Sequence, residues 1–138
     1  MNKLISIKTA YFYSMLLFFL FLFFHIFIII GIEFFNFNLT NYLWGGQLKS
    51  KTELIQFEMI SILIQFLCII ILYLRIRINK FSRYKIILNI FIWTLFILFV
   101  LNTIGNLFAN SLLEKIIFTP ITIVLSLFMF RIGIEKEI

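Results

Sequence analysis

The sequence contains little of what most soluble enzymes are built from. It has no aspartate, one cysteine, one histidine, one proline and five glycines among 138 residues. A single cysteine excludes a disulfide framework and a cysteine-based zinc site. With few carboxylates, the chain has few groups that could act as a general acid or base. No glycine-rich phosphate loop, H-E-x-x-H or G-x-S-x-G motif is present. We therefore predict no enzymatic activity, no cofactor and no metal site.

Charged residues are also scarce. They make up 13% of the chain, against about 25% in a typical soluble domain, whereas hydrophobic residues make up 63%. A globule of this size has too much surface to bury so many apolar side chains, and a disordered chain would be far more polar. The composition therefore indicates a single integral membrane domain over residues 1–138.

Four apolar stretches are close to the length of a membrane-spanning helix, which needs about 20 residues. They predict an all-α fold, a polytopic bundle of four transmembrane helices. Ser50 with Glu53, and Ser111 with Glu114, have the spacing of a capping box, so the second and fourth helices should begin there, on one side of the membrane. Pro120 should kink the fourth helix. The spans are expected at residues 10–32, 53–74, 86–109 and 112–131.

Positive charges predict the orientation, because loops rich in lysine and arginine stay in the cytoplasm. One side would carry three such residues, Lys49, Lys51 and Lys115. Both termini are therefore expected in the cytoplasm, and the net charge of +6 is interpreted as an orientation signal, not as a nucleic-acid patch. The opposite side would carry Lys3, Lys8, Arg75, Arg77, Lys80, Arg83, Lys85, Arg131 and Lys136.

The few polar residues inside the spans recur at helical spacing, so each span has one polar stripe. Most of them belong to the outer half of the bundle, and the inner half is nearly all apolar. We interpret this as a polar vestibule that is open to the outside and closed toward the cytoplasm. The candidate binding residues are His25, Glu58, Ser61, Gln65, Asn102, Asn106, Asn110, Thr119 and Thr122.

These residues also have a purely structural interpretation. Asparagine, serine and threonine often only hold membrane helices together, at about 0.6 kcal/mol per hydrogen bond. In one interpretation Glu58 is solvated at the headgroup level and His25 is a hydrogen-bonded interior residue. In the other, the two side chains pair and hold a proton or a cation. Cys68 is interpreted as an inert small hydrophobe.

The segment between the first two spans, residues 33–53, is too apolar for an ordinary solvated loop. Tyrosine and tryptophan favour the membrane interface, and paired glycines permit a tight turn. We expect either a lid folded over the vestibule or an interfacial anchor. The candidate residues of this loop are Trp44, Gly45, Gly46 and Gln47.

Two segments resemble a family of small, four-helix bacterial membrane proteins of unknown function. One is the W-G-G-Q sequence at residues 44–47, and the other is an N-T-x-G-N…S-x-x-E-K…P pattern from Asn102 to Pro120. The resemblance covers residues 40–126 and implies a multi-pass protein of the bacterial inner membrane, but no activity. Residues 55–58 depart from the family, which has Leu-Pro and a basic residue there.

Two classes of function remain open. The first is a non-catalytic accessory role, as a subunit of a membrane complex or as an immunity-type protein that protects the host membrane. The second is binding or transport of a small cation or small polar molecule through the vestibule. A homodimer would then be expected, because four helices are few for a transporter. The expected partners are the lipid bilayer and another membrane protein, with no nucleic acid.

Overall fold

The computed structural model describes residues 5–77 and 84–135, and within these ranges every regular element is helical. Four helices are long and apolar enough to cross a membrane. This confirms the predicted all-α class. The predicted spans agree to within three residues at each end with these four helices, the fourth of which runs over Glu114–Gly133. The elements are α1 (Ile7–Phe35), η1 (Trp44–Gly46), α2 (Lys51–Arg77), α3 (Tyr84–Phe108), η2 (Glu114–Phe118) and α4 (Thr119–Gly133).

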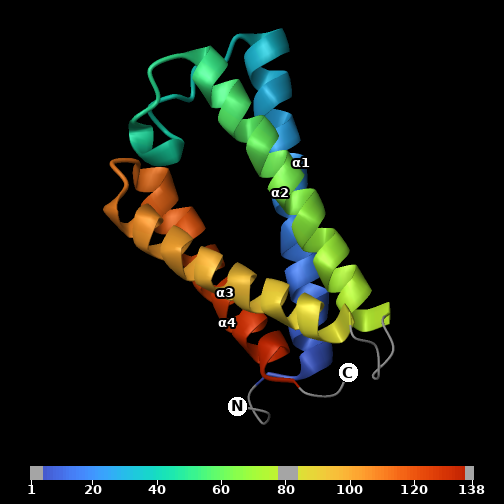
Figure 1. Ribbon diagram of the computed structural model, residues 1–138. Helices are drawn as coiled ribbons and strands as arrows, with labels where there is room; N and C mark the ends of the chain where they lie inside the picture. The colour runs from blue at the N-terminus through green and yellow to red at the C-terminus, as the bar shows by residue number, and fades with distance from the viewer. Residues whose placement is uncertain (1–4, 78–83, 136–138) are drawn as a thin grey trace.

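The helices form two hairpins that diverge from one another. Helix α1 packs chiefly against α2, and α3 packs chiefly against α4. Figure 1 shows that the hairpins meet near the two chain termini and separate toward the opposite end, which carries the loop of residues 36–50. We call these the terminal end and the loop end. Outward-facing apolar side chains such as Phe23 and Leu63, each 65% exposed, suit a surface that contacts lipid.

The two predicted helix caps are present. The Oγ of Ser50 accepts the N–H of Glu53 at 3.1 Å, and the Oγ of Ser111 accepts the N–H of Glu114 at 3.4 Å. The carboxylate of Glu53 stays local and accepts the N–H of Lys49 at 2.8 Å. The carboxylate of Glu114 instead turns away from its own helix, and its hydrogen-bond partner lies in the loop of residues 36–50.

Pro120 follows a π-helical turn, η2. Within this turn the N–H of Thr119 bonds to the carbonyl of Glu114, five residues earlier, and the Thr119 hydroxyl donates to the same carbonyl at 3.2 Å. Such a widened turn is a recognised cause of helix bending. Pro120 itself lies in the first turn of α4, where proline is tolerated, so the irregular turn lies before the proline and not at it.

An apolar core joins the hairpins toward the terminal end. The rings of Phe18 and Phe99 stack there, with centroids 5.7 Å apart. Cys68 lies in this core as a free thiol with no exposed surface, in agreement with its interpretation as a small hydrophobe. The core includes Phe18, Cys68, Leu72, Ile92, Leu95, Phe99, Leu125 and Met129. It fills the space between the hairpins on the terminal side.

The core of this half of the bundle is apolar, in agreement with the prediction, but two arginines at its end are buried. Arg75 and Arg131 are only 3% and 4% exposed, and both lie at the terminal end. Arginines at helix ends usually extend into water. Here Arg131 Nε donates to the carbonyl of Ile5 and Arg75 Nη2 to that of Glu135, each at 3.0 Å, so they bind the ends of the chain. Of the residues used to predict orientation, Lys3, Lys80, Arg83 and Lys136 lie outside the described residues.

Candidate functional site

The loop of residues 36–50 crosses the loop end and is bonded to both hairpins. From the first hairpin, Oε1 of Glu58 on α2 accepts the indole N–H of Trp44 at 2.9 Å. From the second, Oε2 of Glu114 accepts the backbone N–H of Gly45 at 2.8 Å. Two consecutive loop residues are therefore held by carboxylates of different hairpins. The loop spans the opening between the hairpins, as the lid interpretation predicts.

The backbone of the W-G-G turn needs its glycines. Gly45 and Gly46 have φ values of 72° and 69°, in the left-handed region that is costly for residues with a side chain. At Gly46 there is also no space, because a Cβ atom would lie 2.9 Å from the carbonyl oxygen of Asn41. The turn places the indole of Trp44 toward α2 and the N–H of Gly45 toward Glu114.

We expect Gly46→Ala to lower the free energy of unfolding by about 2 kcal/mol, from the left-handed backbone together with the clash. Denaturant unfolding in detergent micelles, followed by tryptophan fluorescence, measures this change. Gly105→Ala is the matched control, because Gly105 lies within α3 and nothing lies within 4 Å of its added Cβ. Equal stability of the two variants would contradict the strained-turn account.

The carboxylate of Glu58 is the most deeply buried acidic group in the described chain. Its side chain is 1% exposed, and Oε2 lies 2.6 Å from Nδ1 of His25 on α1, which is 15% exposed. With Trp44 on the other oxygen, both oxygens have a partner. A carboxylate is stable in such a place only when it is paired and hydrogen-bonded. The predicted pairing of His25 with Glu58 is thus present, and Glu58 is not solvated at the headgroup level.

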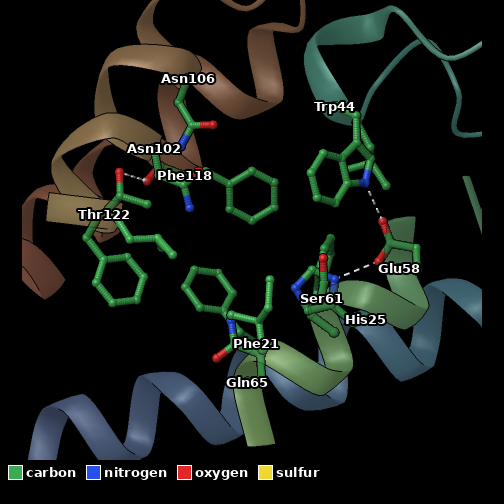
Figure 2. Close-up of a pocket in the computed structure, with 15 residues that line it drawn as sticks. Phe21, His25, Trp44, Glu58, Ser61, Gln65, Asn102, Asn106, Phe118 and Thr122 are labelled. Carbon is green, nitrogen blue, oxygen red and sulfur yellow. Dashed lines mark hydrogen bonds and ion pairs between the residues drawn. The ribbon is translucent and has the colours of Figure 1, made fainter. Parts of the chain in front are cut away.

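A cavity of about 270 Å³ lies beside this pair, between the two hairpins. Figure 2 shows His25 and Glu58 on one side, Asn102 and Asn106 on the other, and Trp44 at the loop edge. The polar side chains that line it are His25, Trp44, Glu58, Ser61, Gln65, Asn102, Asn106 and Thr122. The apolar ones are Phe21, Phe24, Leu43, Ile64, Leu98, Phe99 and Phe118.

Two of the polar lining residues, Thr122 and Gln65, differ in their hydrogen bonding. The hydroxyl of Thr122 bonds to that of Thr103 at 2.9 Å and to its own helix. Gln65 is 8% exposed, and its Oε1 is buried without a hydrogen-bond partner. An unpaired buried acceptor is costly, about 1–3 kcal/mol, and native proteins rarely leave one without a ligand or water. Gln65 therefore marks a place in the cavity for a hydrogen-bond donor.

Some of the predicted site residues do not reach the cavity. Asn110 lies beyond the end of α3, and its backbone N–H donates to the Gly45 carbonyl at 3.2 Å. Thr119 turns its hydroxyl back to its own helix. Gly45 and Gly46 shape the loop, and Gln47 packs beside Gly45. These residues position the lid and do not line the site.

The phenylalanines of the lining were not among the predicted site residues. Phe21 stands one helical turn before His25 on α1, with ring centroids 6.4 Å apart, and Phe24 and Phe118 are 5.4 Å apart across the hairpins. The spacing from Phe21 to His25 is the only sequence signal for this. In a chain with 20 phenylalanines that signal does not stand out.

Comparison of the chain with protein-family models, curated proteins and solved structures gives no significant match. The resemblance to small bacterial membrane proteins therefore stays a prediction. Within residues 5–77 and 84–135, no three His, Cys, Asp or Glu side chains come together in a group that could hold a metal ion. The chemistry of the site is that of the His25–Glu58 pair and its amide, hydroxyl and aromatic neighbours.

Proposed function

We propose that this chain is a non-catalytic binding protein of the bacterial inner membrane, which takes a small cation or small polar molecule into the loop-end cavity. The observation that supports this most is the cavity itself, about 270 Å³ between the hairpins, with a buried carboxylate in its wall. Polar groups that serve only as packing bond to one another across helices. Here Gln65 Oε1 has no such partner.

The lining favours a cation or a neutral polar molecule over an anion. Among the described residues that line the cavity, Glu58 is the acidic one, and none is a lysine or arginine. With His25 neutral, the carboxylate gives the site a negative charge. The faces of Phe21, Phe118 and Trp44 add an electron-rich surface that attracts cations.

We place the loop end outside and both termini in the cytoplasm, on the evidence of the lysine and arginine bias. The ligand would then enter from outside, past the loop. The stacked rings of Phe18 and Phe99 block the way to the terminal end. The geometry therefore supports binding more directly than transport, which would require the hairpins to separate at the core.

An accessory or immunity-type role requires a surface for a partner protein. It does not require a polar cavity with an unsatisfied acceptor, so the cavity favours the binding function over this alternative. The alternative would gain support if the cavity bound none of the probes described next.

Titration with three small probes of different charge, namely methylammonium, acetamide and acetate, tests the proposal. The chain has two tryptophans, so Trp93→Phe leaves Trp44 at the cavity edge as the fluorescent reporter. We expect saturable responses to methylammonium or acetamide at concentrations about tenfold lower than for acetate.

The charge of the site is tested with a pair of variants. Glu58→Gln should abolish the preference for methylammonium, whereas Glu53→Gln, which removes a carboxylate outside the cavity on the same helix, should leave it unchanged. Equal responses to all three probes, or no saturable response, would contradict the proposal.

A further inference from the structure

A second cavity, at the terminal end, has the form of a groove along α3. Its volume is about 570 Å³, and it lies where the end of α2, the start of α3 and the end of the chain after α4 come together. The lining residues of α3 recur every four positions, so they follow one face of the helix over about 18 Å. These residues are Lys85, Ile86, Asn89, Ile90, Trp93, Thr94 and Ile97.

One end of the groove is polar, and two of its buried polar atoms have no hydrogen-bond partner. Arg75, at 3% exposure, uses Nη2 to bind the Glu135 carbonyl, but its Nε–H is buried without a partner. The Oδ1 of Asn89, in the same groove, is also buried without a partner. A buried guanidinium N–H needs an acceptor, and the Asn89 oxygen needs a donor. A ligand that carries both a hydrogen-bond acceptor and a hydrogen-bond donor would therefore satisfy this end of the groove.

Two cationic side chains belong to this end of the groove. Arg75 and Lys85 both line the groove. The one carboxylate in the lining, that of Glu135, is already bonded to Nη1 of Arg131 at 2.6 Å. A guanidinium group offers a planar fork of donors that matches phosphate oxygens.

The rest of the groove is apolar and faces outward. Ile86, Ile90 and Ile97 are 69%, 60% and 56% exposed. Behind them lies the indole of Trp93, packed so closely on α4 that a Cβ atom added at Gly133 would lie 3.1 Å from the ring. The groove thus runs from a charged end into the apolar part of the span, where lipid chains surround the protein.

We propose that this groove binds a phospholipid with an anionic headgroup. The headgroup phosphate accepts the N–H of Arg75 Nε, with Lys85 adding positive charge, and a headgroup hydroxyl donates to Asn89 Oδ1. One acyl chain lies along the exposed isoleucines in front of Trp93. In the orientation proposed above, the groove opens to the cytoplasmic leaflet, whose surface is negatively charged. The site is separate from the loop-end cavity, and either can exist without the other.

Quenching of Trp93 by brominated lipids tests this inference. In the Trp44→Phe protein, Trp93 is the one remaining tryptophan. In mixed micelles we expect brominated phosphatidylglycerol to quench Trp93 at a mole fraction about fivefold lower than brominated phosphatidylcholine does, as a charge contact of this kind implies. Equal quenching by the two lipids would overturn the proposal.

Two variants separate the groove from general charge attraction. Arg75→Gln should remove the preference for phosphatidylglycerol, whereas Arg77→Gln, which removes the same charge from an exposed position outside the groove, should keep it. Lys85→Gln should also weaken the preference for phosphatidylglycerol. This variant tests the groove if the buried Arg75 variant fails to fold. If neither groove variant differs from Arg77→Gln, the proposal fails. Millimolar inorganic phosphate should leave the quenching unchanged, because the proposed lipid is held by its acyl chain as well as its headgroup; complete relief at that concentration would overturn the acyl-chain contact.

Discussion

Replacing Glu58 with leucine is expected to lower the free energy of unfolding by about 3 kcal/mol, because two side chains would lose the acceptor that they share. The Glu58 side chain is 1% exposed and accepts from His25 at 2.6 Å and from Trp44 at 2.9 Å. Leucine would leave the indole N–H and the imidazole buried without this partner. Denaturant unfolding in detergent micelles, monitored by fluorescence, measures the loss.

Two further variants isolate the cause. Glu58→Gln keeps an oxygen for Trp44 and an amide that can donate to His25 in its other tautomer, so we expect less than half of the loss. Gln56→Leu changes an exposed polar residue of the same helix and should shift stability by no more than about 0.5 kcal/mol. If Glu58→Leu were as stable as Gln56→Leu, the carboxylate would not be holding the loop to α2.

Replacing Glu114 with alanine is expected to weaken the attachment of the loop to the second hairpin and let the loop ends of the hairpins move apart. The bonds of Ser111 Oγ to the Tyr42 carbonyl at 2.6 Å and of Asn110 N–H to the Gly45 carbonyl at 3.2 Å would remain. The hairpins already diverge toward this end (Figure 1), and Gly45 is bonded to Glu114 across 69 residues of sequence. A hydrogen bond to a charged group is worth about 2 kcal/mol. Without it, the Gly45 N–H loses its acceptor.

Spin labels on both sides of the opening measure this movement by electron paramagnetic resonance. Labels at Thr52 and Leu112, both exposed, should show longer and more broadly distributed distances in Glu114→Ala. A pair at the terminal end, Tyr73 and Ile87, should be unchanged because the apolar core holds the hairpins there. The single native cysteine, Cys68, is buried and does not compete for label. An unaltered loop-end distribution would show that the Glu114–Gly45 hydrogen bond does not limit the separation of the hairpins.

The helices could be predicted from the sequence because the signals that define them are local. Ser50 and Ser111 cap the helices that follow them, and uninterrupted apolar runs give the spans. The same holds for much of the cavity wall. Ser61 and Gln65 are four residues apart and must share a face of α2 wherever that helix packs.

Partners that lie far apart in the sequence could not be predicted in this way. The position of Glu114 predicts a bond to its own helix end, yet its carboxylate binds Gly45. The position of Arg75 predicts a side chain in water, yet the guanidinium is buried against Glu135. Both outcomes depend on how the hairpins are placed relative to one another. The same placement decides that Thr122 lines the cavity while Thr119, three residues earlier, does not.

We expect the loop-end cavity to open toward the outside and to prefer cations. The most direct test is the rate at which Ser61→Cys reacts with a cationic and an anionic methanethiosulfonate reagent of similar size, each added outside right-side-out inner-membrane vesicles. We predict that the cationic reagent reacts about tenfold faster or more, as expected near a carboxylate in a cavity lined by no lysine or arginine, while Cys68 in the parent protein stays unmodified. Equal rates, a faster anionic reaction, or modification only after permeabilisation would contradict the claim.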